Sequence, residues 1–350
     1  MIGGKVLDTN QLKKIFEDFA EIECEGSSLL YKTLALKIAE DEELLNLCSH
    51  AQEGQPIPNL LFGSVHYLLL QGKQHHLQAF YPSIVAETVQ EGDPYPFFQD
   101  FCEVYREEII ALLRTKLVQT NEVGRCAYLY PAFCHIHQKT EKPLSLIEIG
   151  SSAGLQLLWD QYSYSYGTGK NYGNENSVVH LTSKVREGSM PDFLAAPPLV
   201  KDRVGVDLQI SDLTDEEEYL WLKALIWPEH KERLHTFDKA VEQLRIAPPK
   251  LIEGDGVAML SDLAGNSSED EVLCIFHTHV ANQMPETVKT ELLQKVNRIG
   301  SKRDVFHIYN NISDRKLHMD SFFNGIKEER TIGDTEGHGK WFDWKLPSFQ

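Results

Sequence analysis

A glycine-containing turn near the middle of the chain carries the residues best suited to chemistry. Residues 144–149 form a short apolar run, and a turn that contains Gly150 and Gly154 follows it. Glycine permits a tight turn with positive φ, and a helix that starts behind such a turn presents free backbone N–H groups. Glu148 lies at the end of the predicted strand, where open α/β sheets bind ligands. The segment therefore predicts a ligand-binding loop at the carboxyl edge of a sheet.

The same turn also has the spacing Gly-x-Ser-x-Gly, with Ser152 at its centre. In α/β-hydrolases this spacing exposes a nucleophilic serine on a strained strand-to-helix turn, and the helix N-terminus stabilises an oxyanion. The required acid would be Asp255 or Asp262, and the base would be one of His307, His318 and His338. A hydrolase elbow normally follows several strands and a glycine-rich oxyanion loop, whereas the preceding region here is helical. The hydrolase is therefore the second hypothesis.

The segment around Glu148 resembles the first motif of class I, Rossmann-like methyltransferases, in which an acidic residue precedes a Gly-x-Gly-x-Gly turn. This resemblance implies S-adenosylmethionine as the cofactor, with its methionine end at Glu148. It further implies that Asp207, after the second strand, binds the ribose hydroxyls, and that Asp255, after the third strand, contacts the adenine. The predicted cofactor-binding residues are Glu148, Gly150, Ser151, Ser152, Gly154, Asp207, Asp255 and Gly256.

Two features depart from the methyltransferase pattern. Ser152 stands at the middle glycine of the turn. The gap from Glu148 to Asp207 is far longer than the roughly 20 residues of a simple dinucleotide-binding unit, so an insertion at about residues 162–203 must be looped out. The serine leaves open a third hypothesis, a protein that binds the cofactor without turnover.

A closer resemblance covers nearly the whole chain. The sequence is identified as a member of an uncharacterised bacterial family, domain-of-unknown-function family 2332. The matching stretches lie at residues 58–61, 119–125, 148–155, 227–229, 254–255 and 338–341. The methyltransferase reading rests on structural analogy within this family, and a fold alone does not define a function.

Two histidines and one carboxylate are the candidate catalytic residues. His277 and His279 alternate along the predicted fourth strand, so both are expected on one face, either as a general base or as a pocket wall. No third ligand follows at metal-binding spacing, so no metal is predicted. Glu122 would reach the cofactor pocket from the helical domain. Asn121 and Arg125 are the candidate substrate-binding residues; the alternative for this segment is helix capping and an ion pair.

The elements that position these residues fall into two predicted domains. Residues 1–140 show helical periodicity, including one long amphipathic stretch at 97–117, and are expected to form a helical cap domain. The expected helix caps are Thr9 or Asn10, Ser27 or Ser28, and Thr120 or Asn121.

Residues 141–350 are predicted to form an α/β domain with a doubly wound, Rossmann-like parallel sheet, because apolar runs alternate with helical patterns. The predicted strands are 144–149, 204–208, 250–253, 271–277 and 304–309, and the predicted helices are 216–226, 228–244, 257–263 and 285–297. An antiparallel hairpin of residues 321–331 and 340–346 is expected to close the sheet edge.

Composition restricts the partners. The 350 residues contain 34 Lys and Arg against 52 Asp and Glu, a net charge of −18. This surplus argues against a nucleic-acid partner, which requires cationic patches, and favours a small-molecule substrate. The six cysteines form no CxxC pair, which is typical of reduced thiols. No signal-peptide core or membrane-spanning run is present, so a cytoplasmic protein without a membrane partner is expected.

Overall fold

The computed structural model describes residues 8–89, 92–192 and 196–347, and the chain divides into two compact units. The first unit consists of Met1–Thr120 and Thr214–His235, and the second of Asn121–Leu213 and Thr236–Gln350. This division differs from the predicted boundary at residue 140, because helix α7 (Cys126–Thr140) belongs to the second unit and helix α8 (Glu216–Ala224) to the first.

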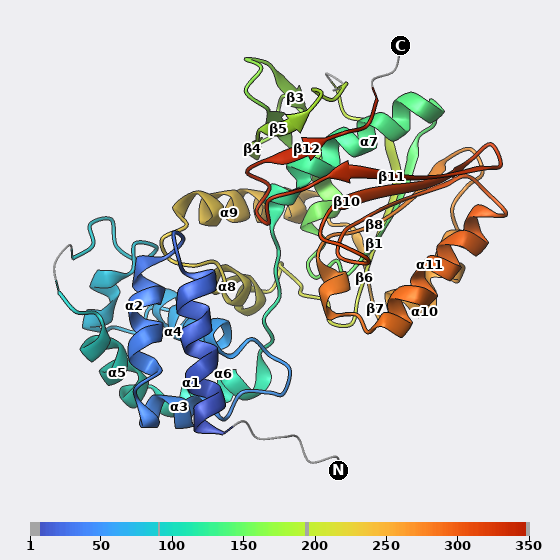
Figure 1. The fold of residues 1–350 in the computed structure, drawn as a ribbon. Coiled ribbons are helices and arrows are strands. Elements are labelled where there is room, and N and C mark those ends of the chain that lie inside the picture. The colour runs from blue at the N-terminus through green and yellow to red at the C-terminus, as the bar shows by residue number, and fades with distance from the viewer. Residues whose placement is uncertain (1–7, 90–91, 193–195, 348–350) are drawn as a thin grey trace. The chain divides into compact units, whose positions relative to one another are not determined.

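The first unit is helical in its described part (Figure 1). Besides α8 it contains α1 (Thr9–Asp18), the π-helix η1 (Phe19–Glu23), α2 (Leu29–Ile38), α3 (Glu42–Cys48), α4 (Ile57–Leu70), the 3₁₀ helix η2 (His76–Phe80), α5 (Tyr95–Val104) and α6 (Arg106–Thr115). Helix α9 (Lys231–Ile246) begins in this unit and ends in the second. The amphipathic stretch predicted at 97–117 is divided between α5 and α6, because Tyr105 leaves helical geometry at φ −108° and ψ 28°.

Of the two helix caps expected at the starts of α1 and α2, one differs in the structure. Asp8, not Thr9 or Asn10, caps α1 through a capping box in which Asp8 and Gln11 each accept the other's backbone N–H. Ser28 caps α2 as predicted, with its hydroxyl accepting from the N–H of Tyr31 at 3.0 Å.

Around α4 the core is aromatic, and Phe62 stacks on Tyr31 with ring centroids 4.2 Å apart.

The second unit is built on a mostly parallel seven-stranded sheet with the order β11-β10-β9-β8-β1-β6-β7. Its strands are β1 (Leu144–Ile149), β6 (Val200–Asp207), β7 (Lys250–Glu253), β8 (Val272–His277), β9 (Val305–Tyr309), β10 (Leu317–Phe323) and β11 (Ile326–Gly333). Strands β1 and β6 to β9 pair in parallel, and β10 pairs antiparallel with both neighbours. The predicted parallel α/β sheet is confirmed. Its strand order reverses between β1 and β8, which is the point where open α/β sheets bind ligands.

Helices cover both faces of the sheet (Figure 1). On one face, Leu260 of α10 (Gly256–Gly265) and Leu292 of α11 (Glu286–Gly300) share a core with Ile147 and Ile149 of β1. On the other face, Phe133 of α7 packs edge-on against Phe276 of β8. Because both faces are covered, every residue of β1 is buried, which explains its continuous apolar run.

The edge hairpin turns at a different place from the prediction. Strands β10 and β11 are joined by Asn324 and Gly325, which both have positive φ, 52° and 74°. These values suit a two-residue type I′ turn, for which Asn-Gly is the preferred sequence. The predicted single strand at 321–331 is therefore wrong. The predicted partner at 340–346 contains β12 (Phe342–Trp344), which instead pairs in parallel with β5 (Val185–Gly188).

The predicted insertion at 162–203 carries a small sheet of its own, apart from residues 193–195, which lie outside the described residues. Strands β2 (Ser163–Ser165), β3 (Asn171–Gly173) and β4 (His180–Thr182) form it in the order β3-β2-β4. Tyr164 stacks on Tyr130 of α7 with centroids 4.4 Å apart, so this tyrosine belongs to the packing between the small sheet and α7. In the described part of the chain, no helix has the length and apolarity needed to cross a bilayer.

The core between α10 and the sheet generates a stability prediction. Leu260→Ala removes a fully buried side chain and should lower the free energy of unfolding by about 2–5 kcal/mol. The matched control is Leu208→Ala, at a side chain that is 77% exposed, which should change it by less than about 0.5 kcal/mol. Urea denaturation of both variants measures the difference, and equal effects would contradict the described core.

Candidate functional site

The loop after β1 is held in a conformation that favours glycine. Gly150 and Gly154 both have φ 76°, and a Cβ on Gly150 would lie 2.5 Å from Cγ2 of Val280. Ser152 also has a positive φ, 48°, which is costly for a residue with a side chain. The predicted strand and turn of residues 144–154 are thus present.

Three hydrogen bonds hold Ser152 and its neighbour in place. The backbone N–H of Ser152 donates to Oδ2 of Asp207 at 2.8 Å, and its Oγ accepts from Nδ2 of Asn121 at 2.9 Å. The N–H of Ala153 donates to Oδ1 of Asn121 at 3.2 Å. Asn121 therefore clamps this loop, whereas the sequence reading had it cap a helix or bind substrate.

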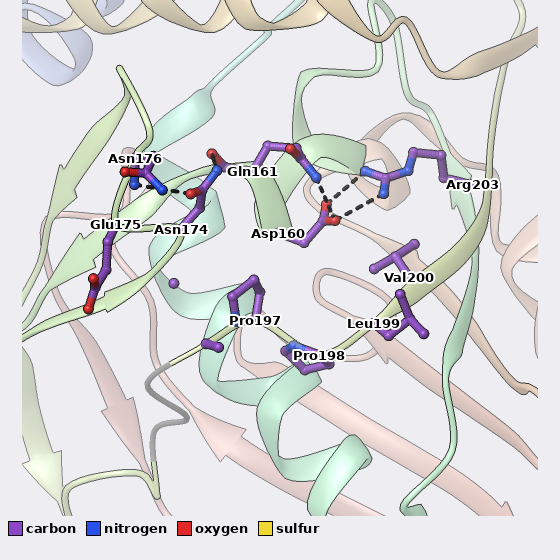
Figure 2. A pocket seen from close by; sticks show the side chains of 12 residues that line it. Asp160, Gln161, Asn174, Glu175, Asn176, Pro197, Pro198, Leu199, Val200 and Arg203 are labelled. Carbon is purple, nitrogen blue, oxygen red and sulfur yellow. Dashed lines mark hydrogen bonds and ion pairs between the residues drawn. The ribbon is translucent and has the colours of Figure 1, made fainter.

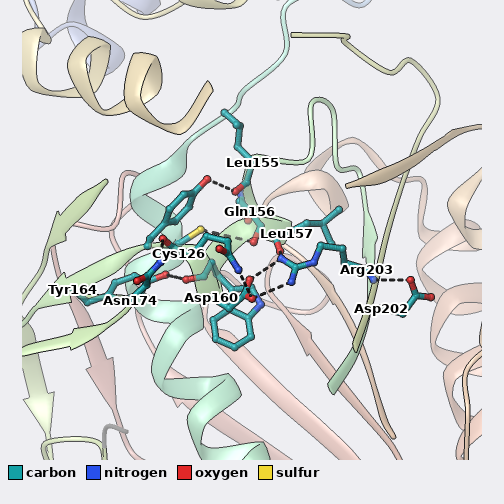
Figure 3. A network of polar contacts seen from close by, with 12 residues as sticks. Cys126, Leu155, Gln156, Leu157, Asp160, Tyr164, Asn174, Asp202 and Arg203 are labelled. Atoms are coloured by element: carbon teal, nitrogen blue, oxygen red, sulfur yellow. Dashed lines mark hydrogen bonds and ion pairs between the residues drawn. The ribbon is translucent and has the colours of Figure 1, made fainter. Parts of the chain in front are cut away.

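A short helix follows the loop, as predicted. It is the 3₁₀ helix η4 (Leu155–Gln161), and side chains that come after it in the chain bind two of its carbonyl groups (Figure 3). Tyr162 Oη donates to the carbonyl of Leu155 at 2.8 Å, and Arg203 Nη1 donates to that of Leu157 at 3.1 Å. A bidentate ion pair between Arg203 and Asp160, at 2.7 and 3.0 Å, fixes the end of η4.

Glu148 lies beneath this loop and is 3% exposed. Its Oε2 has no hydrogen-bond partner among the described residues. Burial raises the pKa of this carboxyl well above its ordinary value, the negative charge of Asp207 raises it further, and the positive charge of Arg125 opposes both effects. Glu148 therefore holds its proton to a higher pH than an exposed carboxyl.

Asp207 is the last residue of β6, next to β1 in the sheet. Besides the Ser152 N–H, its carboxylate accepts the N–H of Gln209 at 3.1 Å. Ser151 is 5% exposed and its Oγ is unpartnered, and a Cβ on Gly205 of β6 would lie 2.6 Å from that oxygen. The structure thus brings Glu148, Ser151, Ser152 and Asp207 together at the carboxyl edge of the sheet.

Asp255 and Gly256 have structural roles at the start of α10. Asp255 is the N-cap, and its Oδ1 accepts from the N–H groups of Val257 at 2.9 Å and Ala258 at 3.0 Å. A Cβ on Gly256 would lie 3.1 Å from Cγ2 of Ile149, so glycine allows α10 to approach β1 closely. These contacts account for both residues without a ligand.

Glu122 pairs with a histidine from the C-terminal loop of the second unit. Its Oε1 accepts the N–H of Gly124 at 3.1 Å, and its Oε2 lies 2.8 Å from Nδ1 of His338. A Cβ on Gly124 would lie 2.1 Å from the carbonyl oxygen of His338, so the two backbones touch. Glu122 belongs to the unit that contains the sheet, which corrects its assignment to the helical domain. The methyltransferase hypothesis assigned no role to His338. The sequence named His338 only as a candidate hydrolase base and placed it in the family-matching stretch 338–341.

Arg125 precedes α7 and is 7% exposed. Its Nε donates to the carbonyl of Gly337 at 3.0 Å, and its Nη1 donates to Oγ1 of Thr278 at 3.3 Å. Thr278 in turn donates to Oε1 of Gln156 at 2.9 Å. Arg125 thereby connects the C-terminal loop with the residue after β8 and with η4.

His277 and His279 do not share a strand face, because β8 ends at His277 and His279 has a left-handed φ of 64°. His277 is fully buried beside His307, with ring centroids 5.4 Å apart. His279 donates its backbone N–H to Oδ1 of Asn310 at 2.7 Å. Burial, followed by the positive charges of Arg125 and His338, lowers the pKa of His279 to about 3, so this ring is neutral at physiological pH.

Several buried polar atoms without partners lie at the carboxyl ends of β1, β8 and β9. Native proteins pair nearly all such atoms, so a cluster of exceptions is typical of a site that binds a ligand or water. Within the described residues, the cluster comprises Glu148 Oε2, Ser151 Oγ, both ring nitrogens of His277, His279 Nε2, Asn310 Nδ2 and Asn311 Nδ2. No group of three or more potential metal ligands occurs in the described part of the chain.

A separate cavity of about 710 Å³ lies at the other end of β6 (Figure 2). Its lining includes Val200, the first residue of β6, and the Asp160–Arg203 ion pair. Since Asp207 ends the same strand, this cavity is remote from the carboxyl edge. It contains none of the predicted site residues.

The residues of a serine hydrolase are not brought together. Among the described residues, no histidine nitrogen bonds Oγ of Ser152, whose partner is Asn121. His307 is buried in the sheet, His318 contacts Asp314 at 2.8 Å, and His338 contacts Glu122. Ser152 therefore lacks the base that would activate it.

Comparison with known proteins gives one match. A family described as uncharacterized protein conserved in bacteria (DUF2332) matches residues 13–344. The chain belongs to this family. No curated protein and no solved structure matches it. The matched range of this DUF2332 chain includes the loop after β1 as well as Glu122 and His338.

Glu148 generates a pH prediction. Above pH 4.5, its ordinary pKa, the unfolded chain loses a proton that the folded protein retains. Stability therefore falls as pH rises from about 4.5 until the buried group ionises, with a slope of up to about 1.4 kcal/mol per pH unit. Glu148→Gln removes this loss, so the variant should gain stability relative to wild type as pH rises from 4 to 8. Urea denaturation at each pH measures the difference between the two proteins, and a constant difference would show that Glu148 ionises normally.

Ser152 generates a second prediction. A fluorophosphonate probe should not label the protein at this serine, because no base of the described residues hydrogen-bonds its Oγ. Intact-mass spectrometry after incubation measures labelling, with Ser152→Ala as the control. Labelling of wild type that disappears in Ser152→Ala would establish the hydrolase instead.

Proposed function

We propose that this DUF2332 protein binds S-adenosylmethionine at the carboxyl edge of its sheet and transfers the methyl group to a small molecule. The observation that carries the proposal is the convergence of Glu148, Asp207 and the loop of residues 150–154 where the strand order reverses. Ligands of open α/β sheets bind at this point.

The residues present suit this cofactor. Oε2 of Glu148 is an unpaired acceptor for the ammonium of the methionine end. The carboxylate of Asp207, at the end of the strand beside β1, suits the ribose hydroxyls, and each of its oxygens has a second lone pair besides the one that binds the loop. The exposed Asp255 is occupied with capping α10 and is not required. When bound, the cofactor supplies an electrophilic methyl group that needs little further activation, so the protein contributes mainly positioning.

The Glu122–His338 pair suits the removal of a proton from the acceptor. A carboxylate that accepts the Nδ1–H of a neutral histidine makes Nε2 the basic nitrogen. His279 is a poor base by comparison, because its pKa of about 3 is far below physiological pH. We therefore assign the general base to His338, positioned by Glu122, and the acceptor is expected to be an O–H or N–H nucleophile.

A second candidate, binding without turnover, is favoured by Ser152. Its side chain stands at the middle glycine of the methyltransferase turn and is bonded to Asn121. Screening of methyl acceptors with isotopically labelled cofactor separates the two functions, since only the methyltransferase releases S-adenosylhomocysteine.

Calorimetric binding of S-adenosylhomocysteine tests the proposed site. Asp207→Asn keeps an oxygen for the Ser152 N–H but removes the charge, and it should weaken binding about 10-fold or more, because a hydrogen bond to a charged group contributes about 1.5–3 kcal/mol. The matched control is Asp202→Asn, on an exposed residue near the opposite end of β6, which should bind like wild type. A ligand at 100 times its Kd should stabilise the folded protein by about 2.7 kcal/mol. Absence of binding to wild type, or equal affinities in the two variants, would refute this cofactor placement.

A further inference from the structure

Arg125 is a buried cation without an anionic partner. Its side chain is 7% exposed, and no carboxylate of the described residues lies within ion-pairing distance of the guanidinium. The two protein acceptors that it contacts, the carbonyl of Gly337 and the hydroxyl of Thr278, are neutral. Buried charges in proteins are normally paired, because desolvation of an isolated charge is costly.

The two neutral contacts fix the direction of the guanidinium plane. Nε and Nη1 are engaged, whereas Nη2 donates to none of the described residues. A guanidinium has five donors in a planar fork that matches the two oxygens of a carboxylate. Arg125 is therefore oriented by the protein and retains donors for an incoming anion.

Glu148 provides a hydrogen-bonding carboxyl group at the same sheet edge. Thr278, the Nη1 partner of Arg125, follows β8, which pairs directly with β1, where Glu148 is the penultimate residue. Oε2 of Glu148 is buried and unpartnered. The positive charge of Arg125 also lowers the pKa of Glu148, so the two groups interact electrostatically.

We propose that Arg125 binds a ligand carboxylate and that Arg125 and Glu148 together recognise the carboxylate and ammonium of an α-amino-acid group. This group has two sources to be distinguished, the amino-acid end of the proposed cofactor or a free amino acid. The first source rests on the proposed function, whereas the second does not require it.

A comparison of two nucleosides tests the first source. S-adenosylhomocysteine carries the α-amino-acid group, and 5′-methylthioadenosine lacks it. Wild type should bind the former at least 10-fold more tightly. Arg125→Gln should abolish most of this preference while changing the affinity for 5′-methylthioadenosine less than 2-fold, and Arg125→Lys should retain part of it. The control is Arg298→Gln, at an exposed residue of α11, which should preserve the wild-type preference.

The ratio of the affinities for S-adenosylhomocysteine and 5′-methylthioadenosine shows whether Arg125 binds the ligand or has only a structural role. Loss of the Gly337 and Thr278 contacts alone would weaken both nucleosides equally. If Arg125→Gln fails to fold, Arg125→Lys and Glu148→Gln provide the same readout, because each should lower the preference for S-adenosylhomocysteine. An unchanged ratio in these variants excludes the cofactor as the source.

Thermal denaturation with 50 mM glycine, L-alanine or L-glutamate tests the second source, with and without 5′-methylthioadenosine. At least one of these amino acids should stabilise wild type but not Arg125→Lys or Arg125→Gln. If the nucleoside ratio is unchanged and no amino acid stabilises wild type more than the variants, the inference is overturned. If neither nucleoside binds but an amino acid does, the proposed cofactor fails while the assignment of Arg125 stands.

Discussion

The hydrogen bond from the Ser152 N–H to the Asp207 carboxylate links the two strands that define the candidate site. It crosses from the loop after β1 to the end of β6 and holds a serine at a positive φ that side chains disfavour. Asn121 completes the clamp from the segment before α7. The parallel pairing of β1 with β6 sets the separation of Glu148 from Asp207, and this contact then fixes the loop that leads into η4.

The carboxyl edge of the sheet makes the free energy of folding less favourable. Two acidic side chains approach each other there, one of them buried, and several polar atoms lack partners. The remainder of the second unit compensates with apolar layers on both faces of the sheet. The unpartnered polar atoms of this edge would gain hydrogen bonds only when a ligand is bound. Ligand binding is therefore a physical reason for a protein to keep them unpaired.

The sequence predicted the parts of the fold that depend on local signals. Apolar runs located β1, β6, β7, β8 and β9 to within a few residues, and glycine located the turn after β1. The Asn324-Gly325 dipeptide is an equally local signal for a hairpin turn. The prediction of one strand over 321–331 did not take it into account. The N-cap role of Asp255 was also local, since aspartate before a helix favours capping.

Other features depended on residues distant in the chain. The end of η4 is held by Arg203, which follows the insertion, and no periodicity reveals its bonds to the Leu157 carbonyl and to Asp160. The separation of His277 from His279 depends on where β8 ends, and element boundaries are the least certain part of a pattern.

The contact between Glu122 and His338 joins positions 216 residues apart, and Gly339 packs against the carbonyl of Gly124 beside it. Contacts of such long sequence separation close large loops and tend to form late in folding. A chain truncated after β11 would therefore retain the loop after β1 and Glu122 but lose His338, and the Glu122 carboxylate would lose this contact.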